Sequence, residues 1–207
     1  MTLSAIEVDH LKQATTIEGV MPAIVGRWSP RSFADREVSP ADLAKVFEAA
    51  RWSASSSNEQ PWRFLVGRRG SSTYKKIFST LVGFNKDWAG SAPVLILGAA
   101  SATFKHNGSA NAYALYDLGA AAAGLSLQAS ALGLRTHSMA GFDHVAARQI
   151  FQIPDDYHLG AVIALGYQGE PSALIHEKLI TQEIAPRTRK PLSEFVLEEW
   201  GTPANLV

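Results

Sequence analysis

The sequence predicts an α+β protein in which helices and short strands are interspersed around one sheet. Apolar residues recur at helical spacing over residues 40–52 and again over about 111–132. Between them, Pro93–Ala99 is a continuous apolar run of strand length. Strands and helices do not alternate regularly enough for a doubly wound fold. The 207 residues contain no repeat, no low-complexity tract and no linker, so we expect a single domain spanning residues 1–207.

The helix expected over residues 40–52 has a recognisable start. Ser39 is the candidate N-cap, Pro40 occupies the first helical position, and Asp42 completes an acidic capping box. The face of this helix that would pack on the sheet is formed by Leu43, Val46, Phe47 and Ala50.

The strand candidates differ in character. A short strand entered through Pro61 is expected over Trp62–Gly67. The run at Pro93–Ala99 suits the middle of a sheet covered on both faces, because it has no polar alternation. Further along, Arg135–Ala140 and Ala161–Gly166 are expected strands, with a short helix after Asp143 between them.

The segment from about 111 to 132 is the longest helix candidate, and Gly133 offers a stop at its C-terminal end. Its other side is also weakly polar, and a helix that is apolar nearly all round must be buried. We therefore expect a central helix, or one pressed against a second subunit. One face carries Leu115, Leu118, Ala122, Leu125, Ala129 and Leu132, and the other carries Ala120, Ala121, Ala123 and Gly124.

The last stretch, Ile180 to Val207, has little periodicity and several proline and charged residues. It is expected to be an extended arm.

Composition excludes several classes of protein. Nineteen basic and nineteen acidic residues give zero net charge, which provides no electrostatic reason to expect nucleic-acid or membrane-surface binding. The chain has no cysteine, so thiol chemistry and cysteine-ligated metals are excluded. Residues 1–9 do not have the pattern of a signal peptide, and the apolar stretch at 118–127 is too short to span a membrane. We expect a cytoplasmic protein.

No familiar catalytic motif is present. A nicotinamide-type glycine fingerprint, a phosphate-binding P-loop, a nucleophile elbow and a zinc-protease helix are all lacking. The six histidines are scattered without ligand spacing, and the carboxylates form no convincing acid–base pair. An enzyme built in this way needs a cofactor to carry the chemistry.

Three polar patches remain as candidate sites. The first combines two guanidinium groups with a hydroxyl, which suits a phosphate and a polar ring edge. The second is dense in small hydrogen-bonding groups, and the third is basic with a hydroxyl. Taken alone, each is better explained as a solvated loop or turn than as a site. The patches are Arg27–Arg31 with Ser32 and Phe33, Ser53–Trp62, and Pro186–Pro191.

Together the patches resemble the nitroreductase family of FMN flavoproteins. The family pattern has a basic residue, any residue, Ser, any residue and a basic residue, then an aromatic, a helix and a Ser-rich loop ending in Asn-x-Gln-Pro-Trp. Arg27–Arg31, Phe33, the 40–52 helix and Ser55–Trp62 match it in order and spacing. The match continues through Asn85, Trp88, Ala92-Pro93, Asp117–Ala120, Ala131–Leu134, Ala140–Asp143, Ile163–Tyr167 and Arg187–Pro191.

The resemblance implies a three-layer α-β-α sandwich with a central mixed or antiparallel sheet, and FMN bound at the interface of a homodimer. By similarity, Arg27 and Arg189 hold the phosphate with Arg187 beside them. Ser29 binds the ribityl or phosphate region, and Arg31 lies at the pyrimidine side of the ring. Asn85 adds a polar contact. Met139, Ala140 and Gly141 lie along the ring, and a backbone N–H of Ala140 or Gly141 donates to flavin N5.

The resemblance also implies that one subunit completes the site of the other. Ala54, Ser55, Ser56 and Asn58 would reach the partner's flavin, and the arm over about 180–207 would wrap the neighbouring subunit. Trp28, within the first patch, stands where a basic residue or His is common. Ala54 replaces a frequent Pro. The chain is short between Leu97 and Asn111, where larger relatives insert material that covers the substrate.

The function implied is oxidation of NAD(P)H with reduction of a nitroaromatic, a quinone or a similar acceptor by the flavin in a ping-pong cycle. The alternatives are a specialised relative, such as a dehalogenase, a flavin-destroying enzyme or an azoline dehydrogenase. A non-catalytic flavin-storage protein and a dimeric interaction domain without flavin also remain open.

Overall fold

The centre of the computed structural model is one four-stranded sheet, and the structure describes residues 3–206. The strands lie in the order β1-β2-β4-β3, and every neighbouring pair is antiparallel. The predicted α+β class is confirmed, with an antiparallel sheet. The strands are β1 (Trp62–Arg68), β2 (Val94–Ser101), β3 (Arg135–Met139) and β4 (Tyr157–Gly166).

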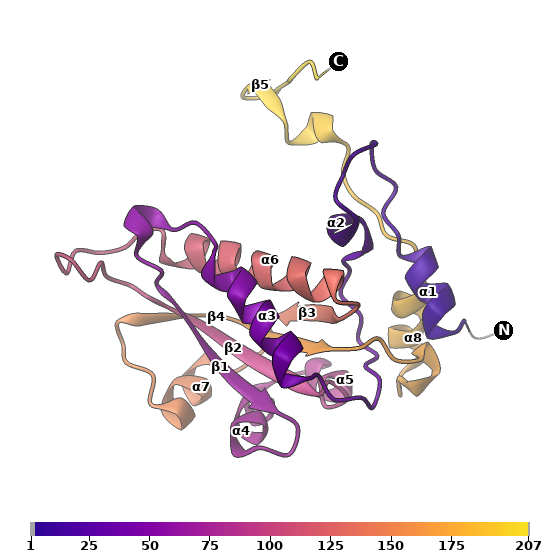
Figure 1. Ribbon diagram of the computed structural model, residues 1–207, viewed down its shortest axis with the longest axis horizontal. Helices are drawn as coiled ribbons and strands as arrows, with labels where there is room; N and C mark the ends of the chain where they lie inside the picture. Colours follow the sequence, from indigo (N-terminus) through magenta and orange to yellow (C-terminus); the bar gives the residue numbers. More distant parts are fainter. Residues whose placement is uncertain (1–2, 207) are drawn as a thin grey trace.

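Helices cover both faces of this sheet, so the protein is a three-layer sandwich (Figure 1). Successive residues of β2 alternate between the two cores. Val94 and Ile96 pack with α3 (Pro40–Arg51) and α6 (Ala114–Ala131). Leu95 and Leu97 pack in the opposite core, with α4 (Ser72–Thr80) and α7 (His144–Phe151). This two-sided burial explains why the strand is apolar throughout.

The remaining elements lie at the ends of the sandwich. In Figure 1 the helices α1 and α8 lie side by side near the N-terminus, and α5 lies below α6. These elements are α1 (Ala5–Leu11), α2 (Pro22–Gly26), α5 (Asn85–Ala89), α8 (Glu177–Ile184), the single turns η1 (Ser56–Asn58), η2 (Pro171–Ala173) and η3 (Leu192–Glu194), and a hairpin of β5 (Leu197–Glu199) with β6 (Thr202–Pro203).

The predicted start of α3 and the predicted end of α6 are both confirmed. The Ser39 hydroxyl oxygen accepts from the Asp42 backbone N–H at 3.0 Å and caps α3. After α6, Gly133 adopts φ 74°, a left-handed conformation that glycine adopts without strain. The N–H of Gly133 then donates to Ser130 O and that of Leu134 to Ala129 O. These two bonds satisfy the last carbonyls of the helix.

Several predicted details are corrected. The Asp42 carboxylate accepts from the Ser39 hydroxyl at 2.9 Å, so it does not close the capping box on the backbone. The helix expected from 111 begins at Ala114, and Leu115, expected on its packed face, is 50% exposed. The strands expected to end at Ala99 and to begin at Ala161 extend to Ser101 and from Tyr157.

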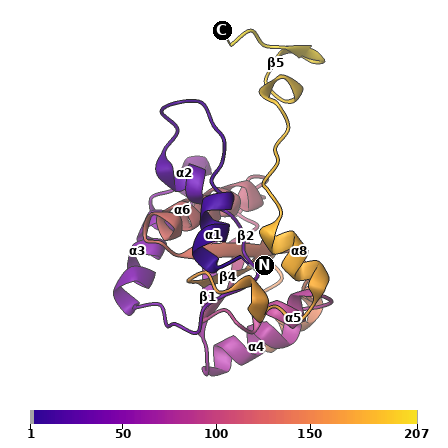
Figure 2. The same ribbon diagram turned by 90° about the vertical axis from the view of Figure 1, so that its right-hand side faces the viewer.

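The predicted arm is partly regular. Residues 180–184 complete α8 instead of belonging to an extended segment. Beyond α8 the chain leaves the body of the protein and carries η3 and the small hairpin at its end (Figure 2). Its aromatic side chains are exposed, with Trp200 99% and Phe195 59% accessible.

No helix in the described part of the chain is long and apolar enough to cross a membrane.

Candidate functional site

Three arginines from the two basic patches come together. Arg27 ends α2 and its guanidinium donates to the Ser29 hydroxyl at 3.4 Å. The pKa of Arg27 is lowered by burial and by the positive charge of Arg189. The pKa of Arg187 is lowered by burial and by the charges of Arg27 and Arg189. Among residues 3–206, no carboxylate forms an ion pair with any of the three. An anion bound here would relieve this mutual repulsion.

One of these arginines also supports the fold. Arg187 donates to the carbonyls of Lys12 and Val25 at 2.7 and 2.8 Å. It therefore joins α1, α2 and the C-terminal segment while it contributes charge to the cluster. Arg189 is exposed and is therefore more accessible to a ligand than Arg187, which is partly buried.

Trp28 lies between the arginines of the first patch but points inward. Its side chain is 5% exposed, and its indole N–H donates to Asp9 at 3.1 Å. Asp9 also pairs with Arg135 at 2.7 Å. The Lys12 ammonium lies 4.7 Å from the centroid of the indole ring. Only the backbone of Trp28 is therefore left to face a ligand.

Two ionisable side chains, His137 and Glu183, contact the backbone of the segment that carries Arg31. Burial lowers the pKa of His137 to about 4, and its Nδ1 lies 2.9 Å from the Pro30 carbonyl oxygen. Burial raises the pKa of Glu183, although the N–H groups of Ser32 and Arg31 and nearby positive charges oppose the shift. The Trp88 ring packs 4.5 Å from His137 and stacks on Phe33, which ties α5 to this segment.

Asn85, at the start of α5, and Gly141, after β3, form a second group. The Asn85 amide donates to the Gly141 carbonyl at 3.0 Å. A Cβ atom at Gly141 would lie 2.7 Å from that amide nitrogen, so only glycine fits there without displacing Asn85. The Phe142 N–H donates to the Ala140 carbonyl and fixes the peptide that carries the Gly141 N–H. Ala140 is exposed, whereas the Met139 side chain is buried in the core.

The Ser-rich loop is strained. Ser57, Asn58 and Gln60 have φ of 52°, 54° and 51°, a region that residues other than glycine seldom adopt. Several hydrogen bonds hold the loop in this shape. The Ser56 N–H donates to Asp117, the Gln60 N–H donates to the Ser55 hydroxyl, and the N–H groups of Asn58 and Glu59 donate to the Ser55 and Ser56 carbonyls. Ala54 and Asn58 are exposed, and Ser55 and Ser56 are partly buried. Strained loops of this kind are concentrated at functional sites.

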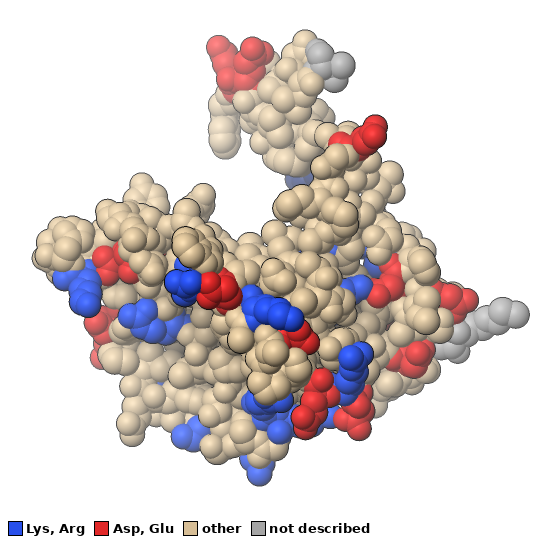
Figure 3. Space-filling model, viewed as in Figure 1, with Lys and Arg blue, Asp and Glu red and all other residues tan. Residues whose placement is uncertain are grey.

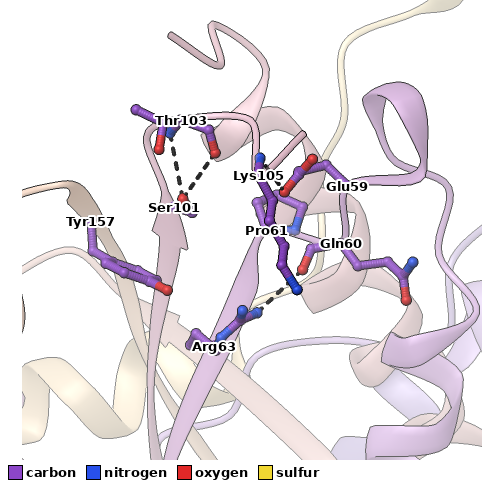
Figure 4. A pocket seen from close by; sticks show the side chains of 8 residues that line it. All are labelled: Glu59, Gln60, Pro61, Arg63, Ser101, Thr103, Lys105 and Tyr157. Carbon is purple, nitrogen blue, oxygen red and sulfur yellow. Dashed lines mark hydrogen bonds between the residues drawn. The ribbon is translucent and has the colours of Figure 1, made fainter. Parts of the chain in front are cut away.

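A polar cavity of about 590 Å³ flanks this loop (Figure 4). Arg63 and Lys105 supply positive charge, and the Glu59 carboxylate accepts from the Lys105 backbone N–H at 2.9 Å. Between 97 and 111, where the chain is short compared with larger relatives, residues up to Ser101 complete β2, and a loop closed by a bridge between Thr103 and Ala110 follows. The cavity is lined by Glu59, Gln60, Pro61, Arg63, Ser101, Thr103, Lys105 and Tyr157.

The structure brings together one part of the predicted site and leaves another part distant. The arginine segments and the Asn85 group lie at the end of the sandwich near α1 and α5, whereas the Ser-rich loop lies at the opposite end, beyond α3 (Figure 1). The sequence did not identify the residues that hold the arginine segments, or one another, through hydrogen bonds, ion pairs and packing. They are Asp9, Lys12, Arg135, His137 and Glu183. No group of three residues that could hold a metal ion occurs within the described chain.

The fold and the site define a class of protein, a three-layer α+β sandwich with a cluster of three arginines that has the charge to bind an anionic group. The nitroreductase family model matches residues 24–78 and 71–167, which is most of the chain. The chain therefore belongs to the nitroreductase family.

Three other proteins are similar to this chain. The chain is 37% identical over 149 residues to a 15.4 kDa protein of Mycolicibacterium smegmatis, covering 68% of this chain and 99% of that one. It resembles the crystal structure of an oxidoreductase containing FMN, with a TM-score of 0.84, 31% identity and 90% and 95% of the two chains covered. A structure from Desulfovibrio desulfuricans, provisionally named a nitroreductase and in complex with FMN, has a TM-score of 0.71, 25% identity and coverage of 89% and 98%.

Proposed function

We propose that the protein is an FMN-dependent oxidoreductase that oxidises NAD(P)H and reduces an electron-poor acceptor such as a nitroaromatic or a quinone. The observation that carries the proposal is the cluster of Arg27, Arg187 and Arg189 without a carboxylate partner in the described chain. Two relatives whose names or titles mention FMN share the fold at 31% and 25% identity. The sequence contains no acid–base pair that could perform the chemistry without a cofactor.

The residues at the arginine cluster fit a flavin phosphate. Arg27 and Arg189 would bind the phosphate with charged hydrogen bonds, and Arg187 would contribute mainly charge because two backbone carbonyls occupy it. Ser29 would bind the ribityl chain or the phosphate through its hydroxyl, which already lies beside Arg27. Trp28 would contribute only backbone, since its indole is held by Asp9.

The residues at the other end of this site fit a flat polar ring. Arg31 would stabilise negative charge at the pyrimidine edge, and Asn85 would add a polar contact. Met139, Ala140 and Gly141 would line the ring through their backbone, with the N–H of Ala140 or Gly141 donating to flavin N5. When bound, FMN would supply the carrier of hydride and electrons between NAD(P)H and the acceptor.

The protein would work as a homodimer, with two equivalent sites related by twofold symmetry. The Ser-rich loop and the arginine segments lie at opposite ends of the sandwich (Figure 1), so Ala54, Ser55, Ser56 and Asn58 would contact the flavin of the partner subunit and not that of their own chain. In Figure 3 the upper side of the body, where α6 lies, shows few charged side chains, whereas the tip of the arm carries acidic ones. Helix α6 exposes Tyr116 and Leu115 at 78% and 50%, and the arm exposes Trp200 at 99%. Exposed apolar side chains of this kind fit a subunit interface.

We further propose that residues 1–207 form one domain whose arm wraps the partner subunit. The ends of that domain, residues 1, 2 and 207, lie outside the described residues. We also propose that the protein acts in the cytoplasm on small-molecule donors and acceptors. Its zero net charge gives no electrostatic reason to expect a nucleic-acid or membrane partner.

The test is anaerobic spectroscopy of the purified protein. We expect a yellow protein that NADH or NADPH bleaches, and whose colour returns when nitrofurazone or menadione is added. A colourless protein that takes up no FMN would refute flavin binding. A yellow protein that neither nicotinamide bleaches would refute the NAD(P)H oxidoreductase and indicate flavin storage. Bleaching without reoxidation by either acceptor would refute the proposed acceptor class and favour a specialised relative.

A further inference from the structure

We propose that Glu183, together with His137, is a positioning residue that fixes the backbone of Arg31 so that its guanidinium faces the flavin ring. This inference rests on the proposed function. It concerns two side chains on α8 and β3, which are distant in sequence from the arginine segment and outside its motif.

The Glu183 carboxylate binds the arginine segment from below. Its two oxygens each accept from the Arg31 N–H at 3.0 Å, and one of them accepts from the Ser32 N–H at 3.1 Å. The side chain is completely buried. A buried carboxylate is costly unless its oxygens are paired, so its contacts are expected to be specific. Three hydrogen bonds to two adjacent peptides leave that backbone little freedom.

The neighbouring backbone groups are held from other directions. His137 Nδ1 lies 2.9 Å from the Pro30 carbonyl. With that nitrogen protonated, the neutral imidazole donates to the carbonyl. The Ser32 carbonyl accepts from the Gly169 N–H at 2.9 Å, and the Ser32 hydroxyl donates to the Glu170 carbonyl at 2.6 Å. Backbone polar groups on both sides of Arg31 are therefore fixed by β3, α8 and the segment after β4, while its side chain is not used in these contacts.

Lys12 supports Glu183 in turn. Its ammonium is part of a side chain that is 4% exposed, and it donates to the carbonyls of Gln182 and Ala185 at the end of α8. A cation at this position stabilises the C-terminal end of a helix. The positive charge of Lys12 also favours the charged form of Glu183. The helices α1 and α8 thus form a support under the Arg31 peptide.

The test measures flavin binding and backbone exchange in the full-length protein. Glu183→Gln is nearly isosteric but turns an amide N–H₂ toward the Arg31 N–H. We expect it to weaken both FMN and riboflavin roughly tenfold or more, because a charged hydrogen bond is lost at the ring end. Arg27→Ala should weaken FMN much more than riboflavin, which has no phosphate. Glu177→Gln, an exposed glutamate on the same helix, is the matched control and should change neither.

Two measurements separate positioning from general destabilisation. Amide hydrogen exchange over residues 27–34, without added flavin, should be faster in Glu183→Gln and unchanged in Glu177→Gln. In a double-mutant cycle with Arg31→Ala, the two losses of riboflavin affinity should not add, since Glu183 acts through Arg31. Additive losses, or unchanged exchange, would overturn the inference.

If His137→Ala fails to fold, His137→Gln takes its place. The glutamine keeps a donor to Pro30, so we expect it to raise exchange over residues 27–34 only slightly. His137→Ala should increase exchange over the same residues and lower riboflavin affinity, and unchanged values would overturn its positioning role. If the wild-type protein binds no flavin, the proposed function fails. If it binds flavin and Glu183→Gln binds equally well, only this inference fails.

Discussion

The segment Arg27–Phe33 and the loop Ser53–Gln60 are both polar and are both proposed to contact flavin, yet the fold holds them differently. The first is fixed by buried side chains on β3 and α8, with Glu183 accepting from two of its N–H groups. The second has four of its eight residues exposed and contains three residues with positive φ. One half of the proposed site is therefore held by side chains from several elements, while the other half is strained and is held mainly by its own hydrogen bonds and by contacts with α6.

This difference has a physical consequence for assembly. A loop held in an unfavourable conformation needs surroundings that compensate for the strain. In the loop, only Ser56 and Gln60 are held by side-chain acceptors, Asp117 and Ser55. A second subunit and its flavin would supply the remaining contacts.

Removing the arm should have the largest effect. The deletion of residues 191–207 removes the exposed anchors Phe195 and Trp200. At roughly 2 kcal/mol for each aromatic anchor, dimer affinity should fall by about a thousandfold. Sedimentation velocity over a range of concentrations measures this. Trp200→Ala should give an intermediate loss. A truncated protein that remains dimeric with full flavin content would contradict the proposed role of the arm.

The pH dependence of stability tests the fixed segment. His137 has a folded-state pKa of about 4, below the unfolded value of 6.5, so the unfolded chain takes up the proton first. Its contribution is complete above pH 6.5, falls as the pH drops toward 4 and then levels off. The loss is on the order of 3 kcal/mol.

The control for this prediction is His137→Gln, which keeps a donor to Pro30 but does not titrate. Glu183 has a raised pKa and contributes with the opposite sign, losing stability as the pH rises from 4.5 through its folded pKa. The difference between wild type and His137→Gln in urea unfolding therefore isolates the histidine. If the free energy of unfolding changed with pH equally in wild type and His137→Gln between pH 4 and 6.5, His137 would not be buried as a neutral ring.

Substitution of Arg27 should reduce FMN affinity without unfolding the segment Arg27–Phe33. A charged hydrogen bond contributes about 1.5–3 kcal/mol, so Arg27→Ala should weaken FMN by about 10- to 150-fold. Arg51→Ala is the matched control, because Arg51 is exposed and contacts Glu48 and Trp52 at the end of α3, away from the arginine cluster. Fluorescence titration of the apoprotein measures both. Unchanged FMN affinity in Arg27→Ala would place the phosphate elsewhere.

The sequence predicted the elements whose signals are local. The Ser39 cap, the Gly133 stop and the apolar strand β2 depend on residues that are adjacent in the chain. The helices α1 and α4 were missed although Ser4 with Glu7, and Ser71 before Tyr74, form local caps. Short helices with few apolar positions have a weak periodic pattern, so tertiary contacts decide whether they form.

The supporting residues of the site could not be predicted in the same way. Glutamate and lysine on a helix usually face solvent, so the sequence gives no sign that Glu183 and Lys12 are buried. Only the packing of α8 and α1 against the arginine segment buries them. His137 became significant only because β3 places it beneath Pro30. The residues expected to contact flavin came from a contiguous family pattern, whereas their supports are distant in sequence and lie outside that pattern.

The smallest expected effect concerns the strained loop. Ser57 adopts φ 52°, which costs about 1–2 kcal/mol for a residue with a Cβ atom, while glycine adds about 0.4–1 kcal/mol of unfolded-state freedom. Ser57→Gly should therefore stabilise the protein by about 0.5 kcal/mol. Ser55→Gly is the matched control, since Ser55 is extended at φ −148° and its hydroxyl accepts from Gln60, so that variant should destabilise. Calorimetry of both variants, with and without FMN, gives the signs. If Ser57→Gly destabilised the protein as Ser55→Gly does, the loop would not store strain, and its contrast with the arginine segment would be one of exposure alone.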